Sequence, residues 1–115
     1  MARTGCTLAL AALLGASLFV TPARAQEGSL AQDLTNCAGA VAAHAGFDVL
    51  TFPRDASGEW TPVLQRIMDA MNTEPGVEGM TGRYASSAAR EFWNEQPRDA
   101  REQAAAACRT RFGGE

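Results

Sequence analysis

Lysine is absent from this sequence, and all ten basic residues are arginines. The absence excludes chemistry that needs a lysine amine, such as a Schiff base, a lysine general base or the phosphate-binding lysine of a P-loop. Histidine occurs once, at His44, so histidines alone cannot form a zinc site. No Cys-x-x-Cys segment occurs, which excludes the common dithiol redox motif and the covalent haem motif. We therefore expect no enzymatic activity and no cofactor.

Residues 1–25 have the composition of a cleavable signal peptide. Arg3 precedes an uncharged run over 7–20 that is rich in leucine and alanine, and small residues occupy the −3 and −1 positions of a cleavage site that ends at Ala25. The run is shorter than the roughly 20 apolar residues of a membrane span; an uncleaved anchor is the alternative. Cleavage predicts one mature domain, 26–115, which is periplasmic or secreted and has no stable membrane association.

The predicted mature chain has the composition of an acidic globular domain. Hydrophobic residues make up 46% of the sequence and charged residues 20%, which argues against wholesale disorder. Removal of the signal peptide takes away two arginines and leaves 13 acidic residues against eight basic ones. A negative surface disfavours nucleic acid and anionic membranes as partners. The sequence leaves the oligomeric state open.

Two cysteines, Cys37 and Cys108, remain in the predicted mature chain. In an oxidising compartment the simplest interpretation is one intramolecular disulfide, with two unpaired thiols or an intermolecular bond as alternatives. The bond would close a loop of about 70 residues and stabilise the fold by about 4 kcal/mol on the chain-entropy model. A domain of this length has a net stability of about 5–13 kcal/mol, so the disulfide would supply a large share.

The first two helices are predicted from apolar spacing and end signals. Residues 30–45 repeat apolar side chains every three or four positions, after an N-cap candidate at Ser29 and before a stop at Gly46. A second helix starts at Thr61-Pro62, an N-cap followed by proline at the first helical position. Its predicted buried stripe is Val63, Leu64, Ile67, Met68 and Met71. The connector between them, 47–59, is expected to be irregular, with its apolar side chains packed against the helices.

The third predicted helix opens at Pro75 or near Thr81, because three glycines weaken the stretch that follows Pro75. Its apolar spacing predicts a buried stripe of Val77, Met80, Tyr84, Ala88 and Phe92. A fourth helix, 97–111, has acidic residues in its first half and arginines at its end, an order that complements the helix dipole.

The expected fold is all-α: a small up-and-down bundle of three to four helices, with the first and last joined by the Cys37–Cys108 disulfide. The plan of a short exported helical chain with one long-range disulfide is similar to that of small periplasmic acid-stress chaperones. That resemblance implies a holdase that unmasks core surface when carboxylates are protonated at low pH. This sequence departs from the lysine-rich composition of those proteins.

The candidate residues for binding a protein partner are Trp93, Trp60 and Phe52. Trp93 lies off the apolar stripe of the third predicted helix, and an exposed tryptophan often marks a binding surface. The alternative is that Trp93 packs under the 47–59 connector. Glu91 and Glu95, one turn apart on the same helix, are expected on a solvated face, with Arg83 and Arg90 close enough to screen them.

A metal carrier is a further hypothesis. Met68, Met71 and Met80 have soft thioether sulfur atoms that suit copper(I), and His44 could add a nitrogen ligand. Methionine also commonly fills helical cores, so we expect no bound metal. The function predicted from the sequence is that of an exported, non-enzymatic protein-binding module whose partner is unknown. An acid-stress holdase and a metal carrier are the alternatives.

Overall fold

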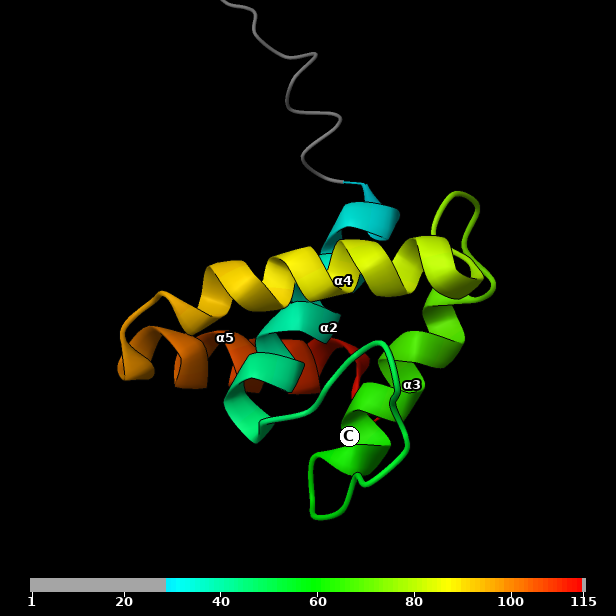
Figure 1. Cartoon of the computed structure of the whole chain (residues 1–115). Coiled ribbons are helices and arrows are strands. Elements are labelled where there is room, and N and C mark those ends of the chain that lie inside the picture. The colour runs from blue at the N-terminus through cyan, green and yellow to red at the C-terminus, as the bar shows by residue number, and fades with distance from the viewer. Residues whose placement is uncertain (1–28, 115) are drawn as a thin grey trace, which may run out of the picture.

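The computed structural model describes residues 29–114, which form four α-helices and no strand (Figure 1). The helices are α2 (Leu30–Ala45), α3 (Thr61–Met71), α4 (Gly79–Asn94) and α5 (Arg98–Phe112). The all-α prediction is confirmed for this part of the chain, where no helix is long and apolar enough to cross a membrane. The predicted signal peptide, 1–25, lies outside the described residues.

α2 begins and ends where the sequence predicts. The backbone N–H of Gln32 donates to Oγ of Ser29 at 3.1 Å, which satisfies a free amide of the first turn. At the other end Gly46 adopts the left-handed conformation, with φ of 82°, and its N–H donates to the carbonyl of Ala42. Every residue in 37–42 is buried, so α2 is surrounded by the rest of the fold.

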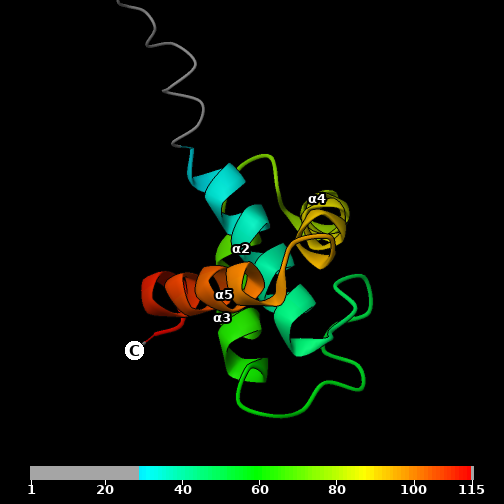
Figure 2. The ribbon, with the colours of Figure 1, turned by 90° about the vertical axis from the view of Figure 1, so that its left-hand side faces the viewer.

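The other three helices pack around α2 (Figure 2). α3 runs antiparallel to α2, whereas α4 and α5 cross α2 at steep angles in both views. α5 also runs opposite to α4, so the expected up-and-down order holds within each pair of consecutive helices, α2–α3 and α4–α5, but not between the two pairs. Small residues allow the crossing: a Cβ added at Gly39 would lie only 2.5 Å from Cβ of Ala89, so α2 and α4 are already in close contact there.

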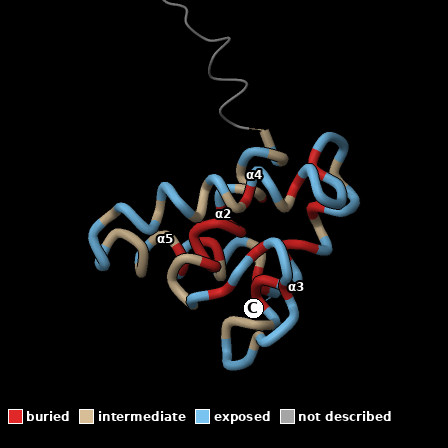
Figure 3. Tube along the Cα trace, viewed as in Figure 1, coloured by how far each residue is buried: buried red, intermediate tan, exposed pale blue. Residues whose placement is uncertain are grey.

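The core lies where α2, α3 and the 47–59 connector meet, as the buried segments in Figure 3 show. The connector is irregular, as expected, and buries Phe47, Val49 and Phe52, although Leu50 is exposed. The predicted buried stripe of α3 is confirmed in full: Val63, Leu64, Ile67, Met68 and Met71. Thr61 is the first residue of α3, not its N-cap, a position that Trp60 takes without a side-chain hydrogen bond.

The predicted buried stripe of the third helix is wrong. α4 begins at Gly79, between the two expected starts, and buries Gly82 and Ser86, while Met80, Tyr84, Ala88 and Phe92 are exposed. Of the predicted stripe only Val77 is buried, and it precedes the helix. The physical reason is close packing, because helices that approach through small side chains leave no space there for large ones.

A disulfide between Cys37 and Cys108 joins α2 to α5, as predicted, with the two Cα atoms 5.4 Å apart. α5 carries Asp99 in its first turn and Arg109 and Arg111 in its last turn, which also agrees with the sequence analysis. Disulfides persist in oxidising environments, so the bond indicates such a compartment for this chain.

Candidate partner-binding surface

One side of α4 is apolar and open to solvent. Of the five large hydrophobic side chains that are exposed within residues 29–114, three lie on this helix: Met80 is 48% exposed, Tyr84 61% and Phe92 53%. Positions four residues apart lie above one another on a helix, and the exposed Ala88 fills the gap in the series. We call Met80, Tyr84, Ala88 and Phe92 the α4 outer face.

The opposite side of α4 holds the helix in place. Oγ of the buried Ser86 donates to the carbonyl of Gly82 at 2.8 Å, so the hydroxyl is satisfied within the helix. Near the middle of α2, a Cβ on Gly39 would lie 2.6 Å from the backbone nitrogen of Arg90, which shows how closely the two helices approach. The α4 outer face therefore sits on a helix that is fixed from behind.

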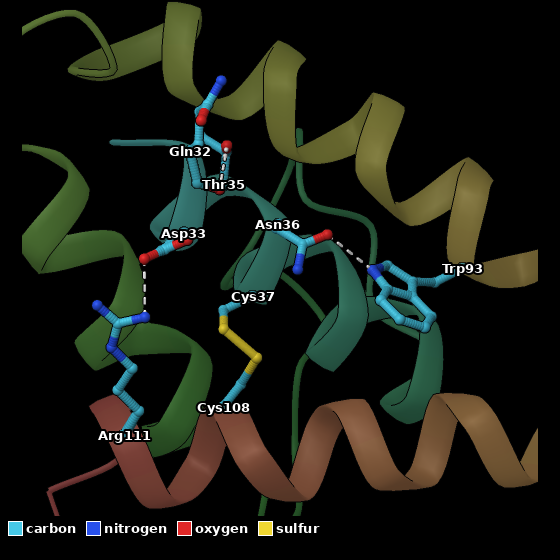
Figure 4. The surroundings of a disulfide bond; sticks show 8 residues. All are labelled: Gln32, Asp33, Thr35, Asn36, Cys37, Trp93, Cys108 and Arg111. Carbon is cyan, nitrogen blue, oxygen red and sulfur yellow. Dashed lines mark hydrogen bonds and ion pairs between the residues drawn. A yellow bond between two sulfur atoms is a disulfide. The ribbon is translucent and has the colours of Figure 1, made fainter. Parts of the chain in front are cut away.

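Trp93 connects the α4 outer face to α2. Its ring meets Phe92 edge-on, with ring centroids 5.1 Å apart. Its Nε1 donates to Oδ1 of Asn36 at 3.0 Å (Figure 4), and the side chain is half-buried. The sequence left open whether Trp93 is exposed or lies under the connector; the structure places it against α2.

The two arginines of α4 point away from the outer face. One guanidinium nitrogen of Arg83 donates to the carbonyls of Val49 and Phe52, both at 2.8 Å, and so ties the connector to α4. Nε of Arg90 is buried. Among the described residues neither arginine forms an ion pair with Glu91 or Glu95, and Arg83 is directed at connector carbonyls instead.

Two carboxylates remain beside the α4 outer face at its C-terminal end. Glu91 and Glu95 are both exposed and lie one turn apart, on either side of Phe92 in sequence. Among the described residues three ion pairs form, Arg98–Glu102, Arg109–Glu59 and Arg111–Asp33, and none of them includes Glu91 or Glu95. The outer face is thus apolar along its length and acidic at one end.

The other predicted partner-binding residues lie elsewhere. Trp60 is half-buried, with its ring edge-on to His44 and the guanidinium of Arg109 over its face, each 5.0 Å away. Phe52 is only 3% exposed and packs against Phe47 in the core. Met80 and Tyr84 are surface residues although their apolar spacing predicts that they lie in the core.

A groove of about 330 Å³ lies over the disulfide between α2 and α5. It is lined by the disulfide, by Ala104 and Ala107 of α5, and by Trp93; Figure 4 shows the disulfide and Trp93. The polar groups at its rim are engaged with one another: Asp33 accepts from Arg111 at 2.8 Å, and Asn36 accepts from Trp93. The groove therefore offers a small apolar surface without a free charge to select a ligand.

The side chains considered for a metal carrier lie in different surroundings. Met68 and Met71 are buried in the core, Met80 is on the α4 outer face, and His44 packs on Trp60. Within residues 29–114 no three histidine, cysteine, aspartate or glutamate side chains are close enough together to hold a metal ion. The arrangement gives no support to a metal centre.

Comparisons with models of protein families, with curated proteins and with solved structures found no match to this chain. The α4 outer face differs most from an ordinary solvated helix surface, since three large apolar side chains line up there beside two exposed carboxylates.

Proposed function

We propose that this protein binds another protein through the α4 outer face and has no catalytic activity of its own. The observation that carries the proposal is the exposure of Met80, Tyr84 and Phe92 in one series along a single helix. The removal of apolar surface from water is the main favourable term in most protein–protein association. Contiguous apolar patches on soluble proteins commonly mark interaction sites, and aromatic residues often dominate the energetics of such sites.

Rigidity also supports the proposal. The bonds from Arg83 to the connector and the close contact at Gly39 fix α4 before any partner arrives. A surface that is already in its binding conformation loses less conformational entropy on association, which favours affinity. The proposed site of action is the periplasm or the space outside the cell, since the predicted signal peptide and the disulfide both agree with export.

A triple substitution tests the proposal. Met80→Ser, Tyr84→Ser and Phe92→Ser together should leave the far-UV circular dichroism spectrum unchanged, because these side chains are exposed. The same variant should lose at least tenfold in the amount of partner that it retains from the native exported fraction. The matched control is Leu30→Ser with Leu50→Ser, which removes two exposed apolar side chains from elsewhere and should retain the partner. Equal retention by the triple variant and the wild-type protein would refute the proposed surface.

The pH dependence of hydrophobic-dye binding distinguishes a protein-binding module from an acid-stress holdase. The α4 outer face is exposed in the folded protein, so the wild-type protein should bind the dye at pH 7, and the triple variant should bind much less. A holdase of the kind that the sequence resembles would instead bind dye only after acidification.

A further inference from the structure

We infer that the α4 outer face binds an amphipathic helix that carries lysine or arginine beside its apolar stripe. This inference rests on the proposed function and specifies the chemistry of the partner. The inference is based on the position of Phe92 next to the exposed carboxylates of Glu91 and Glu95. Among the described residues no cation forms an ion pair with either carboxylate.

The shape of the α4 outer face suits a helix. Its four residues recur every four positions from 80 to 92, so they form a ridge about 18 Å long at 1.5 Å per residue. An amphipathic helix presents its apolar side chains at the same spacing and can lie along such a ridge. The small Ala88 between Tyr84 and Phe92 makes the ridge lower at that point, which leaves room for a large apolar side chain of the partner.

The charges beside the α4 outer face determine which charge the partner helix should carry. Glu91 and Glu95 lie where residues that flank the stripe of a bound helix would approach, and Arg83 is committed to the connector. An acidic partner would therefore meet uncompensated like charge. A basic partner would form two new ion pairs, which favour its association and discriminate against acidic helices.

A second copy of this chain fits the surface poorly. In a parallel pair of α4 helices, Glu91 and Glu95 would lie beside the same residues of the other copy. In an antiparallel pair centred on the ridge, Glu95 would approach Glu78, which immediately precedes α4. Both arrangements bring like charges together, so the complementary occupant is a different, basic chain.

The test uses two synthetic 18-residue helical peptides with the same leucine stripe, one flanked by lysines and the other by glutamates. Binding to the oxidised protein from the exported fraction is measured by fluorescence anisotropy at 50 mM and 500 mM salt. We expect the lysine peptide to bind at least tenfold more tightly at 50 mM salt. The preference should shrink at 500 mM salt, because the Debye length falls well below its value of about 10 Å at 0.1 M.

Two matched double variants show whether the preference for the lysine peptide comes from Glu91 and Glu95 or from the net charge of the whole protein. Glu91→Gln with Glu95→Gln should reduce the preference for the lysine peptide to less than threefold while both peptides still bind. Glu59→Gln with Glu102→Gln, which alters the net charge equally but away from the outer face, should leave the preference intact. An undiminished preference in the first variant would overturn the inference.

The remaining outcomes distinguish the inference from the proposed function. If the lysine peptide does not bind, but the native partner is retained by the wild-type protein and lost by the triple serine variant, the proposed function stands and the inference is wrong. If neither peptide nor partner depends on the outer face, both fail. Concentration-dependent self-association in sedimentation that the triple serine variant abolishes would identify a second copy as the occupant and also overturn the inference.

Discussion

Single residues set how closely the helices approach one another, and Gly39 on α2 shows this most directly. An alanine at position 39 would bring its Cβ 2.5 Å from Cβ of Ala89 and 2.6 Å from the backbone nitrogen of Arg90. Real Cβ atoms do not tolerate such contacts, and two of the three close atoms belong to the backbone. On an exposed helix the same change would instead stabilise the protein by about 1 kcal/mol.

We therefore predict that Gly39→Ala destabilises the protein, against the usual helix preference. The expected loss is about 1–3 kcal/mol, the range for overpacking in a tight interior. Urea denaturation monitored by circular dichroism measures the change. Ala88→Ser, on the exposed side of α4, is the control and should change the stability by less than about 0.5 kcal/mol. A Gly39→Ala protein as stable as the wild type would show that the two helices are not in close contact.

Arg83 acts at the same scale, as a link between α4 and the connector. In Arg83→Gln the carbonyls of Val49 and Phe52 lose a charged donor, which should cost about 1–3 kcal/mol of stability. The connector should also open more often, so that trypsin cleaves after the exposed Arg54 faster than in the wild-type protein.

The control for Arg83 is Arg98→Gln. Arg98 pairs with Glu102 on the surface of α5, where its side chain is 80% exposed, so its loss should cost less than about 1 kcal/mol. It should leave cleavage at Arg54 unchanged. If Arg83→Gln also leaves that cleavage rate unchanged, the arginine does not hold the connector.

At the scale of elements, the sequence predicts α2, α3 and α5 closely. For α4 it predicts the wrong buried side. Ser29 and Gly46 mark the ends of α2 because cap residues act locally, through bonds to their own helix. The stripe of α3 was predicted because its largest apolar residues are also its buried ones. In both helices, local signals and tertiary packing agree.

α4 breaks that agreement. Apolar periodicity assigns the largest apolar side chains of a helix to the core, and it therefore predicts that Met80, Tyr84 and Phe92 are buried. In the structure the small residues Gly82 and Ser86 face inward, against Met71 at the end of α3, and farther along α4 Ala89 meets Gly39 of the alanine-rich α2. Close approach between two such helices depends on both sequences at once, which the pattern of one segment cannot reveal. The candidate site was missed for the same reason.

At the scale of the whole molecule, the disulfide connects the central helix to the C-terminal one. α2 and α5 face each other through small side chains, with the buried Ala105 near Cys108 on α5. Contacts between small side chains bury little apolar area per residue and so contribute little to stability. The covalent bond should therefore supply much of what keeps α5 in place.

We predict that Cys37→Ala with Cys108→Ala lowers the free energy of unfolding substantially. The two cysteines are 71 residues apart in sequence, and on the chain-entropy model a loop of this size is worth about 4 kcal/mol. Urea denaturation of the variant and of the oxidised wild-type protein measures the difference. Reduced wild-type protein should unfold at the same urea concentration as the variant, because both lack the cross-link and differ only by two small side chains.

The predicted loss of stability requires that the Cys37–Cys108 bond is formed in every molecule of the native protein. The bond stabilises the fold by restricting the unfolded chain, and it does so only in molecules that contain it. Intact protein from its natural source, alkylated without prior reduction, should gain no alkyl group on Cys37 or Cys108. Two alkylated thiols would mean that α5 is held by side-chain contacts alone. The substitutions would then have almost no effect on stability, and the inferred oxidising compartment would lose its support.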